Sequence, residues 1–161
     1  MNATIFYILG LATVLATVMA ITRRELIHAV VYLVVSFFAL SLIFYMMGAP
    51  LIAALEVIVY AGAIMVLFLF IVMMLEMGRP KAAPGPFFRT WGLALILGSV
   101  IFACTAILIG TGAGPEVAGT AYISPRTFGQ ALYTKQMLAV EAVSLLLLFA
   151  LVGALYLGKR D

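Results

Sequence analysis

Two acidic residues lie inside long apolar stretches of the sequence, where a charge is costly. Glu56 and Glu141 are each surrounded by runs of aliphatic side chains. On insertion scales a carboxylate at the centre of a spanning helix costs about 2.5–3.5 kcal/mol, and less near its end. Such residues usually face the protein interior and take part in ion or proton pathways. We therefore predict that Glu56, and also Glu141, carry or polarise protons; the alternative is that they only fix helix packing or reach the membrane interface.

Glu56 is followed by a phenol and by a run of small residues. Tyr60 is four positions further on, so a regular helix places it on the face of Glu56, where it can donate or accept a hydrogen bond. Ala61-Gly62-Ala63 permits close helix contact in a membrane. Gly62 also weakens the helix locally, which permits a kink or a π-bulge. We predict a proton path at Glu56 and Tyr60 with a hinge at Ala61 and Gly62; a simple packing notch is the alternative.

The elements that hold these residues must be membrane-spanning helices. The chain is 66% hydrophobic and only 9% charged, whereas soluble domains average about 25% charged residues. Disorder, a disulfide scaffold and an autonomous water-soluble enzyme are thereby excluded. A span needs about 20 apolar residues, and five stretches qualify: 3–21, 27–47, 51–75, 91–110 and 136–157. Backbone groups in lipid must be bonded internally, so we predict an all-α integral membrane protein, a single five-span domain over residues 1–161.

The connections between the spans differ in kind. Gly48-Ala49-Pro50 predicts a tight turn, with proline at the start of the next helix. Residues 76–90 predict an irregular loop, and residues 111–135 the longest connection. Spans 51–75 and 136–157 start on the same side of the membrane. Glu56 and Glu141 each follow the start of their span by five residues, about 7–8 Å into the helix. The two carboxyl groups could therefore share a polar pocket within this subunit, or each could face a different partner.

The basic residues predict the orientation of the spans. Seven fall on one side: Arg23, Arg24, Arg79, Lys81, Arg89, Lys159 and Arg160. The other side has Arg126 and Lys135. The first side is therefore predicted to be cytoplasmic, with the N-terminus outside and the C-terminus inside. A cleaved signal peptide is the alternative for the first span, but residues 1–7 lack the basic side chain that a signal peptide carries there.

Other chemistry finds little support in the sequence. There is no CxxC, P-loop, GxGxxG or plausible Ser-His-Asp set, and the methionines show no convincing copper spacing. We therefore expect no metal, cofactor or nucleic acid on this chain. Cys104 is expected to be an inert small hydrophobe. The hydroxyl groups within the spans are expected to bond back to their own helices: Ser36, Ser41, Ser99, Thr105 and Ser144.

The segment around Glu56 carries a resemblance to a known family. Residues 56–68 read Glu-Val-Ile-Val-Tyr-Ala-Gly-Ala-Ile-Met-Val-Leu-Phe, and this segment resembles the third helix of subunit J of bacterial NADH:quinone oxidoreductase, respiratory complex I. Residues 28–33 and 138–141 extend the resemblance. It implies a multi-pass subunit of the bacterial inner membrane that packs near subunits A, K and H and contains no redox centre. NADH, FMN, iron–sulfur clusters and quinone would bind to other subunits.

The resemblance also implies a role for the third span. The family's third helix can form a π-bulge around the positions that match Tyr60, Ala61 and Gly62. Switching between the bulged and the regular helix is thought to open or close a water path that couples quinone reduction to proton pumping. We therefore expect a membrane-arm subunit of a proton-pumping oxidoreductase, with no catalytic activity of its own. The alternatives are a subunit of a multisubunit cation/proton antiporter and a purely structural assembly subunit.

The orientation is testable with a reporter fused after Asp161. A fluorescent protein that matures only in the cytoplasm should be bright in this position, and a phosphatase that folds only in the periplasm should be inactive. The same two reporters fused within residues 111–135 should give the opposite results. A phosphatase active after Asp161 contradicts the predicted topology.

Overall fold

The spanning helices account for most of the fold. The computed structural model describes residues 2–23, 25–76, 87–110 and 124–159, and within them every regular element is helical. Five helices are long and apolar enough to cross a membrane: Ala3–Thr22, Leu26–Met46, Pro50–Leu75, Trp91–Gly110 and Met137–Gly158. The predicted all-α fold with five spans is confirmed, and each apolar span begins and ends within one residue of the expected position.

The chain divides into two compact units, Met1–Ala118 and Gly119–Asp161. The first unit contains α1 (Asn2–Thr22), α2 (Leu26–Met46), α3 (Pro50–Leu55), η1 (Glu56–Ile64), α4 (Met65–Glu76) and α5 (Phe87–Gly110). The second unit contains α6 (Pro125–Lys135) and α7 (Met137–Gly158). The third span is one continuous helix made of α3, η1 and α4.

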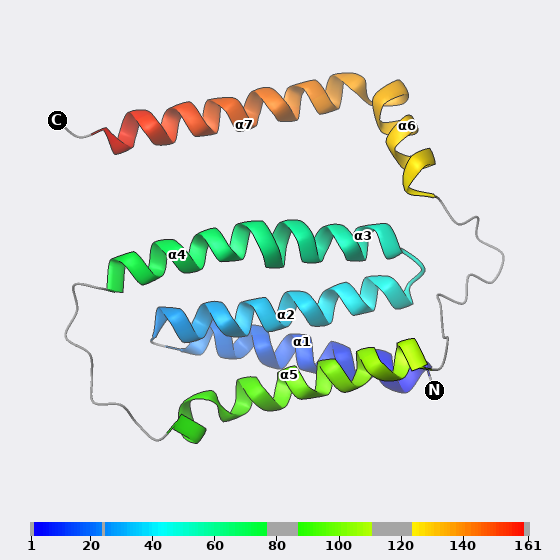
Figure 1. Cartoon of the computed structure of the whole chain (residues 1–161), viewed down its shortest axis with the longest axis vertical. Helices are drawn as coiled ribbons and strands as arrows, with labels where there is room; N and C mark the ends of the chain where they lie inside the picture. Colours follow the sequence, from blue (N-terminus) through cyan, green and yellow to red (C-terminus); the bar gives the residue numbers. More distant parts are fainter. Residues whose placement is uncertain (1, 24, 77–86, 111–123, 160–161) are drawn as a thin grey trace. The chain divides into compact units, whose positions relative to one another are not determined.

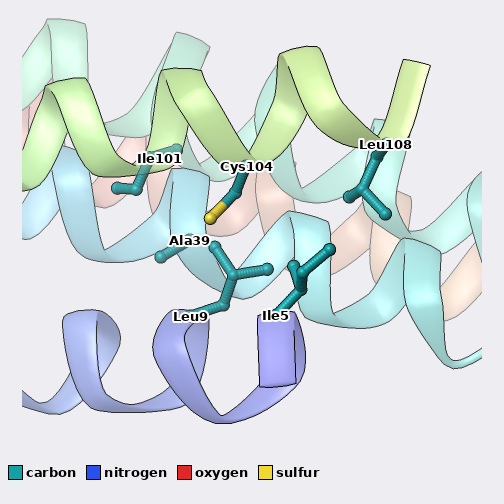
Figure 2. Packing of buried hydrophobic residues seen from close by; sticks show 6 residues of the cluster. All are labelled: Ile5, Leu9, Ala39, Ile101, Cys104 and Leu108. Carbon is teal, nitrogen blue, oxygen red and sulfur yellow. The ribbon is translucent and has the colours of Figure 1, made fainter. Parts of the chain in front are cut away.

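The helix α2 is central to the first unit (Figure 1). It contacts α1 and α5, which also contact each other, and it contacts all three parts of the third span. The side chains of α1, α2 and α5 point toward one another in a buried cluster of Ile5, Leu9, Ala39, Ile101, Cys104 and Leu108 (Figure 2). Cys104 is thus a buried packing residue, as expected. On the other side of α2, a second cluster joins Val30 to Met65 and Val72 of α4.

Polar contacts also join α1 to α2. The hydroxyl groups of Thr17 and Ser36 lie 2.8 Å apart, and Ser36 donates to the carbonyl of Thr13 at 3.4 Å. Beyond the end of α1, Arg23 Nη2 donates to the hydroxyl group of the buried Tyr32 at 3.3 Å. A buried hydroxyl group is costly without a partner, so these bonds favour one arrangement of α1 against α2.

Most spanning hydroxyl groups bond to their own helix, as predicted. Ser41, Ser99, Thr105 and Ser144 donate to carbonyl groups three or four residues earlier. Ser36 departs from the prediction because Thr17 and Thr13 of the neighbouring helix lie within reach of its hydroxyl group.

A tight turn joins α2 to the third span, as the sequence predicts. Gly48 has a positive φ of 82°, a conformation that side chains other than glycine rarely adopt. Its N–H donates to the carbonyl of Tyr45, and the N–H of Ala49 donates to the carbonyl of Phe44. This pair of bonds is a Schellman motif, which bonds the last free carbonyl groups of α2. Pro50 then begins α3, where a proline sacrifices no helical hydrogen bond.

The two long connections contain more helix than predicted. Within 76–90, α5 already begins at Phe87, while residues 77–86 lie outside the described part. Within 111–135, α6 occupies Pro125–Lys135, and residues 111–123 lie outside the described part. The hydroxyl group of Ser124 accepts a hydrogen bond from the Thr127 N–H at 3.2 Å, which caps this helix. Serine followed by proline is a sequence signal for the start of a helix, but a search for apolar spans does not detect it.

Candidate functional site

The middle of the third span is a π-helix, η1. In a π-helix each N–H donates to the carbonyl group five residues earlier, one residue further back than in an α-helix. At the end of η1, the N–H of Met65 makes such a bond to the carbonyl of Tyr60. The structure brings four of the predicted site residues together in η1: Glu56, Tyr60, Ala61 and Gly62.

Gly62 is a position where this π-helix leaves little room for a side chain. A Cβ atom added at Gly62 would lie 3.2 Å from the carbonyl oxygen of Val57, five residues earlier. That oxygen belongs to the helix backbone, so it cannot move aside as a flexible side chain could. At the other described helical glycines, such as Gly10 and Gly153, an added Cβ meets no atom of another part of the chain within 4 Å. A side chain at position 62 of the π-helix therefore requires a small shift of the backbone around Val57.

The π-helix shifts the buried face of the third span by one residue. The buried positions are Ala53 and Glu56, followed by Ala61, Met65 and Val72, all at most 8% exposed. The step from Glu56 to Ala61 is five residues, where a regular helix would continue the face after four. The residues directly before Ala61, Met65 and Val72 face outward instead, at 45–48% exposure: Tyr60, Ile64 and Ile71.

Tyr60 is therefore not on the face where the sequence places it. Four-residue spacing predicts that Tyr60 and Glu56 share a face, but Glu56 is buried and Tyr60 is 48% exposed. The extra residue in the π-turn puts Ala61 on the buried side instead. The Tyr60 ring lies against Phe37 of α2, with ring centres 5.6 Å apart. Phe37 was not predicted as part of the site, because it is one of many apolar side chains in the second span and nothing in the sequence distinguishes it from them.

Glu56 is the one acidic side chain that is buried among those the structure describes. Its carboxyl group forms no ion pair with another described residue. Ser36 and Ser41, both on α2, are also buried polar residues of the described part of the first unit. Glu56 is the first residue of η1, so it lies at the point where the regular helix gives way to the π-helix.

Glu141 lies in the second unit, on α7. Its backbone carbonyl accepts a hydrogen bond from the Ser144 hydroxyl group at 2.7 Å. The matched depth of Glu141 and Glu56, and the pocket that they could share, remain predictions.

Known proteins resemble this chain along almost its whole length. Residues 16–157 match the family model described as NADH-ubiquinone/plastoquinone oxidoreductase chain 6. The chain belongs to this family. The NADH-quinone oxidoreductase subunit J of Pseudomonas aeruginosa is 41% identical over 163 residues, covering 97% of this chain and 96% of that relative. The subunit J of Escherichia coli K12 is 39% identical, covering 97% and 86%, and that of Buchnera aphidicola from Schizaphis graminum is 34% identical, covering 97% of each.

These findings agree with the resemblance that the sequence shows around Glu56. Together with the five apolar helices, the bacterial members of the family identify the chain as a multi-pass protein of the inner membrane.

The shifted face of the third span is testable by disulfide cross-linking. In a Cys104→Ala background, cysteines at positions 30 and 72 should cross-link efficiently on oxidation, because Val30 and Val72 belong to one buried cluster. Cysteines at positions 30 and 71 should cross-link poorly, because Ile71 faces outward. Protection from a maleimide–polyethylene glycol reagent measures the cross-link in membranes. Equal cross-linking of the two pairs contradicts the π-helical register.

Proposed function

We propose that this chain is the membrane-arm subunit J of a proton-pumping NADH:quinone oxidoreductase. In this proposal its third span couples quinone reduction to proton translocation by switching between the π-helix and a regular α-helix. The observation that carries the proposal is the π-helix over Glu56–Ile64, which coincides with the predicted hinge at Ala61 and Gly62. π-Helices are rare and occur frequently at functional sites.

The switch would exchange the face that the span presents to α2. When the π-turn becomes a regular α-turn, the helix that follows it rotates by about 100° relative to the part that precedes it. Tyr60, Ile64 and Ile71 would then take the places of Ala61, Met65 and Val72. A phenol would replace a methyl group on the buried face that includes Glu56, since four-residue spacing brings the two side chains together in a regular helix.

This exchange would change the route available to a proton. In the π-helical form Tyr60 packs against Phe37 and is turned away from the buried face. In the regular form the Tyr60 hydroxyl group could donate to or accept from the Glu56 carboxyl group. Glu56 would act as the proton carrier and Tyr60 as the hydrogen-bonding relay, with Glu141 as a second carrier at similar depth.

The chain would perform no redox chemistry itself. We propose that NADH, FMN, iron–sulfur clusters and quinone bind to other subunits, and that subunits A, K and H are its neighbours. The names of the bacterial relatives support membership of such a complex. They favour the oxidoreductase over a subunit of a cation/proton antiporter, which would transport ions without a redox partner. The alternative of a purely structural subunit is tested below by variants of Glu56 and Glu141.

Gly62→Leu should lower quinone-reductase activity and proton pumping while the complex still assembles. Any side chain at position 62 presses on the Val57 carbonyl oxygen in the π-helix. Even alanine is more favourable than glycine in a regular helix by about 1 kcal/mol, so Gly62→Ala should give a milder defect of the same kind. NADH:quinone turnover of the purified complex measures both effects.

The matched control is Gly153→Ala, where the added Cβ meets no neighbouring atom. This variant should keep wild-type turnover. Wild-type turnover of assembled Gly62→Leu complex would refute the switch.

Glu56→Gln should give a milder defect than Gly62→Leu. The amide retains hydrogen bonding but has no transferable proton. We expect fewer protons pumped per electron pair in proteoliposomes, measured against the initial rate of NADH oxidation. A normal stoichiometry counts against Glu56 as a carrier, and normal pumping by both the Glu56 and the Glu141 variants favours the structural role.

A further inference from the structure

The short helix α6 is joined almost directly to a membrane span. Gln136 is the single residue between α6 and α7, and its φ of −121° and ψ of 26° interrupt the helix. As a result α6 runs across the axis of α7 instead of continuing it (Figure 1). Because α7 crosses the membrane, its first residue lies near the membrane surface. An 11-residue helix is only about 16 Å long, so all of α6 must stay close to that surface.

The residues of α6 are divided between two faces. At 100° per residue, Pro125, Phe128, Gly129 and Leu132 lie on one side, with Ala131 and Tyr133 at its borders. Lys135, the last residue of the helix, also lies on this side, next to Phe128. The opposite side has Arg126, Thr127, Gln130 and Thr134. Such a division is typical of helices that lie in the plane of a membrane interface, with the apolar face buried at the boundary between headgroups and acyl chains.

The charges and the aromatic residues of α6 fit a lipid surface. Arg126 and Lys135 are its only charged residues, and both are cations with long apolar stems, which can reach phosphate groups while the stems stay in an apolar layer. Tyr133 is 67% exposed, and tyrosine is enriched at membrane interfaces because its ring is apolar and its hydroxyl group is polar.

We propose that α6 lies in the lipid headgroup layer at the start of α7, with Phe128 and Leu132 facing the acyl chains and Gln130 and Thr134 facing water. The binding partner is a bilayer surface that contains anionic phospholipid. The helix then holds the first turn of α7 at a fixed depth. This inference concerns the second unit alone and stands apart from the proposed switch in the third span.

Cysteine accessibility in inner-membrane vesicles tests the two faces. Single cysteines replace Leu132 or Gln130 in a Cys104→Ala background, with Phe128 and Thr134 as a second pair in case one variant fails to accumulate. The vesicles are prepared in both orientations and treated with a charged, membrane-impermeant maleimide. We expect Gln130→Cys to react at least about tenfold faster than Leu132→Cys, because the reactive thiolate is suppressed in apolar surroundings. Equal rates overturn the proposal.

A lipid-borne quencher identifies what covers the apolar face. The protein is purified with its bound subunits and labelled with bimane at position 132 or 130. It is then placed in nanodiscs of phosphatidylethanolamine and phosphatidylglycerol that contain a doxyl-labelled lipid. Quenching should be stronger at position 132 than at 130. A label at position 132 that reacts slowly and is not quenched by lipid indicates that another protein chain covers the face, which also overturns the proposal.

Discussion

Inside a membrane, a helix cannot expose its backbone in order to change shape. Each unbonded N–H or carbonyl group in lipid costs several kcal/mol, so a spanning helix can rearrange only by exchanging one complete bonding pattern for another. The π-helix meets this condition, because its bonds reach five residues back, as the Met65 N–H does to the Tyr60 carbonyl. A change of register within the third span is therefore compatible with lipid, whereas local unfolding is not.

A register change also requires one surface that stays fixed, and α2 supplies it. On one side α2 is held by the cluster around Leu9, Ala39 and Cys104 and by the hydroxyl contact between Thr17 and Ser36. On the other side it contacts the third span through Phe37 and the cluster around Val30. The first side combines dense packing with polar bonds, while the contacts named on the second side are between apolar side chains and aromatic rings. Apolar contacts lack direction, so they can accept a rotated helix at lower cost than hydrogen bonds can.

The sequence predicts the spans well because lipid leaves a helix as the only option for long apolar stretches. It also identifies Gly62 as a weak point, since glycine lowers helix stability in any context. The exposure of Tyr60 could not be predicted, because spacing arguments assume about 3.6 residues in every turn. One additional residue within η1 invalidates that assumption for every later position of the span. The helix α6 was missed for another reason: its start signal at Ser124 and Pro125 is local and independent of hydropathy.

The position of Glu56 within the third span gives the proposed switch a direction. Glu56 is the first residue of η1, directly after the regular turn of α3, so it precedes the part that would rotate. Tyr60 lies within the π-helix and would rotate with α4. The buried carboxyl group would therefore stay in place while the phenol moves toward or away from it. A switch built in this way alters the proton path through the relay and leaves the buried acid, which is the group most costly to displace in lipid, where it is.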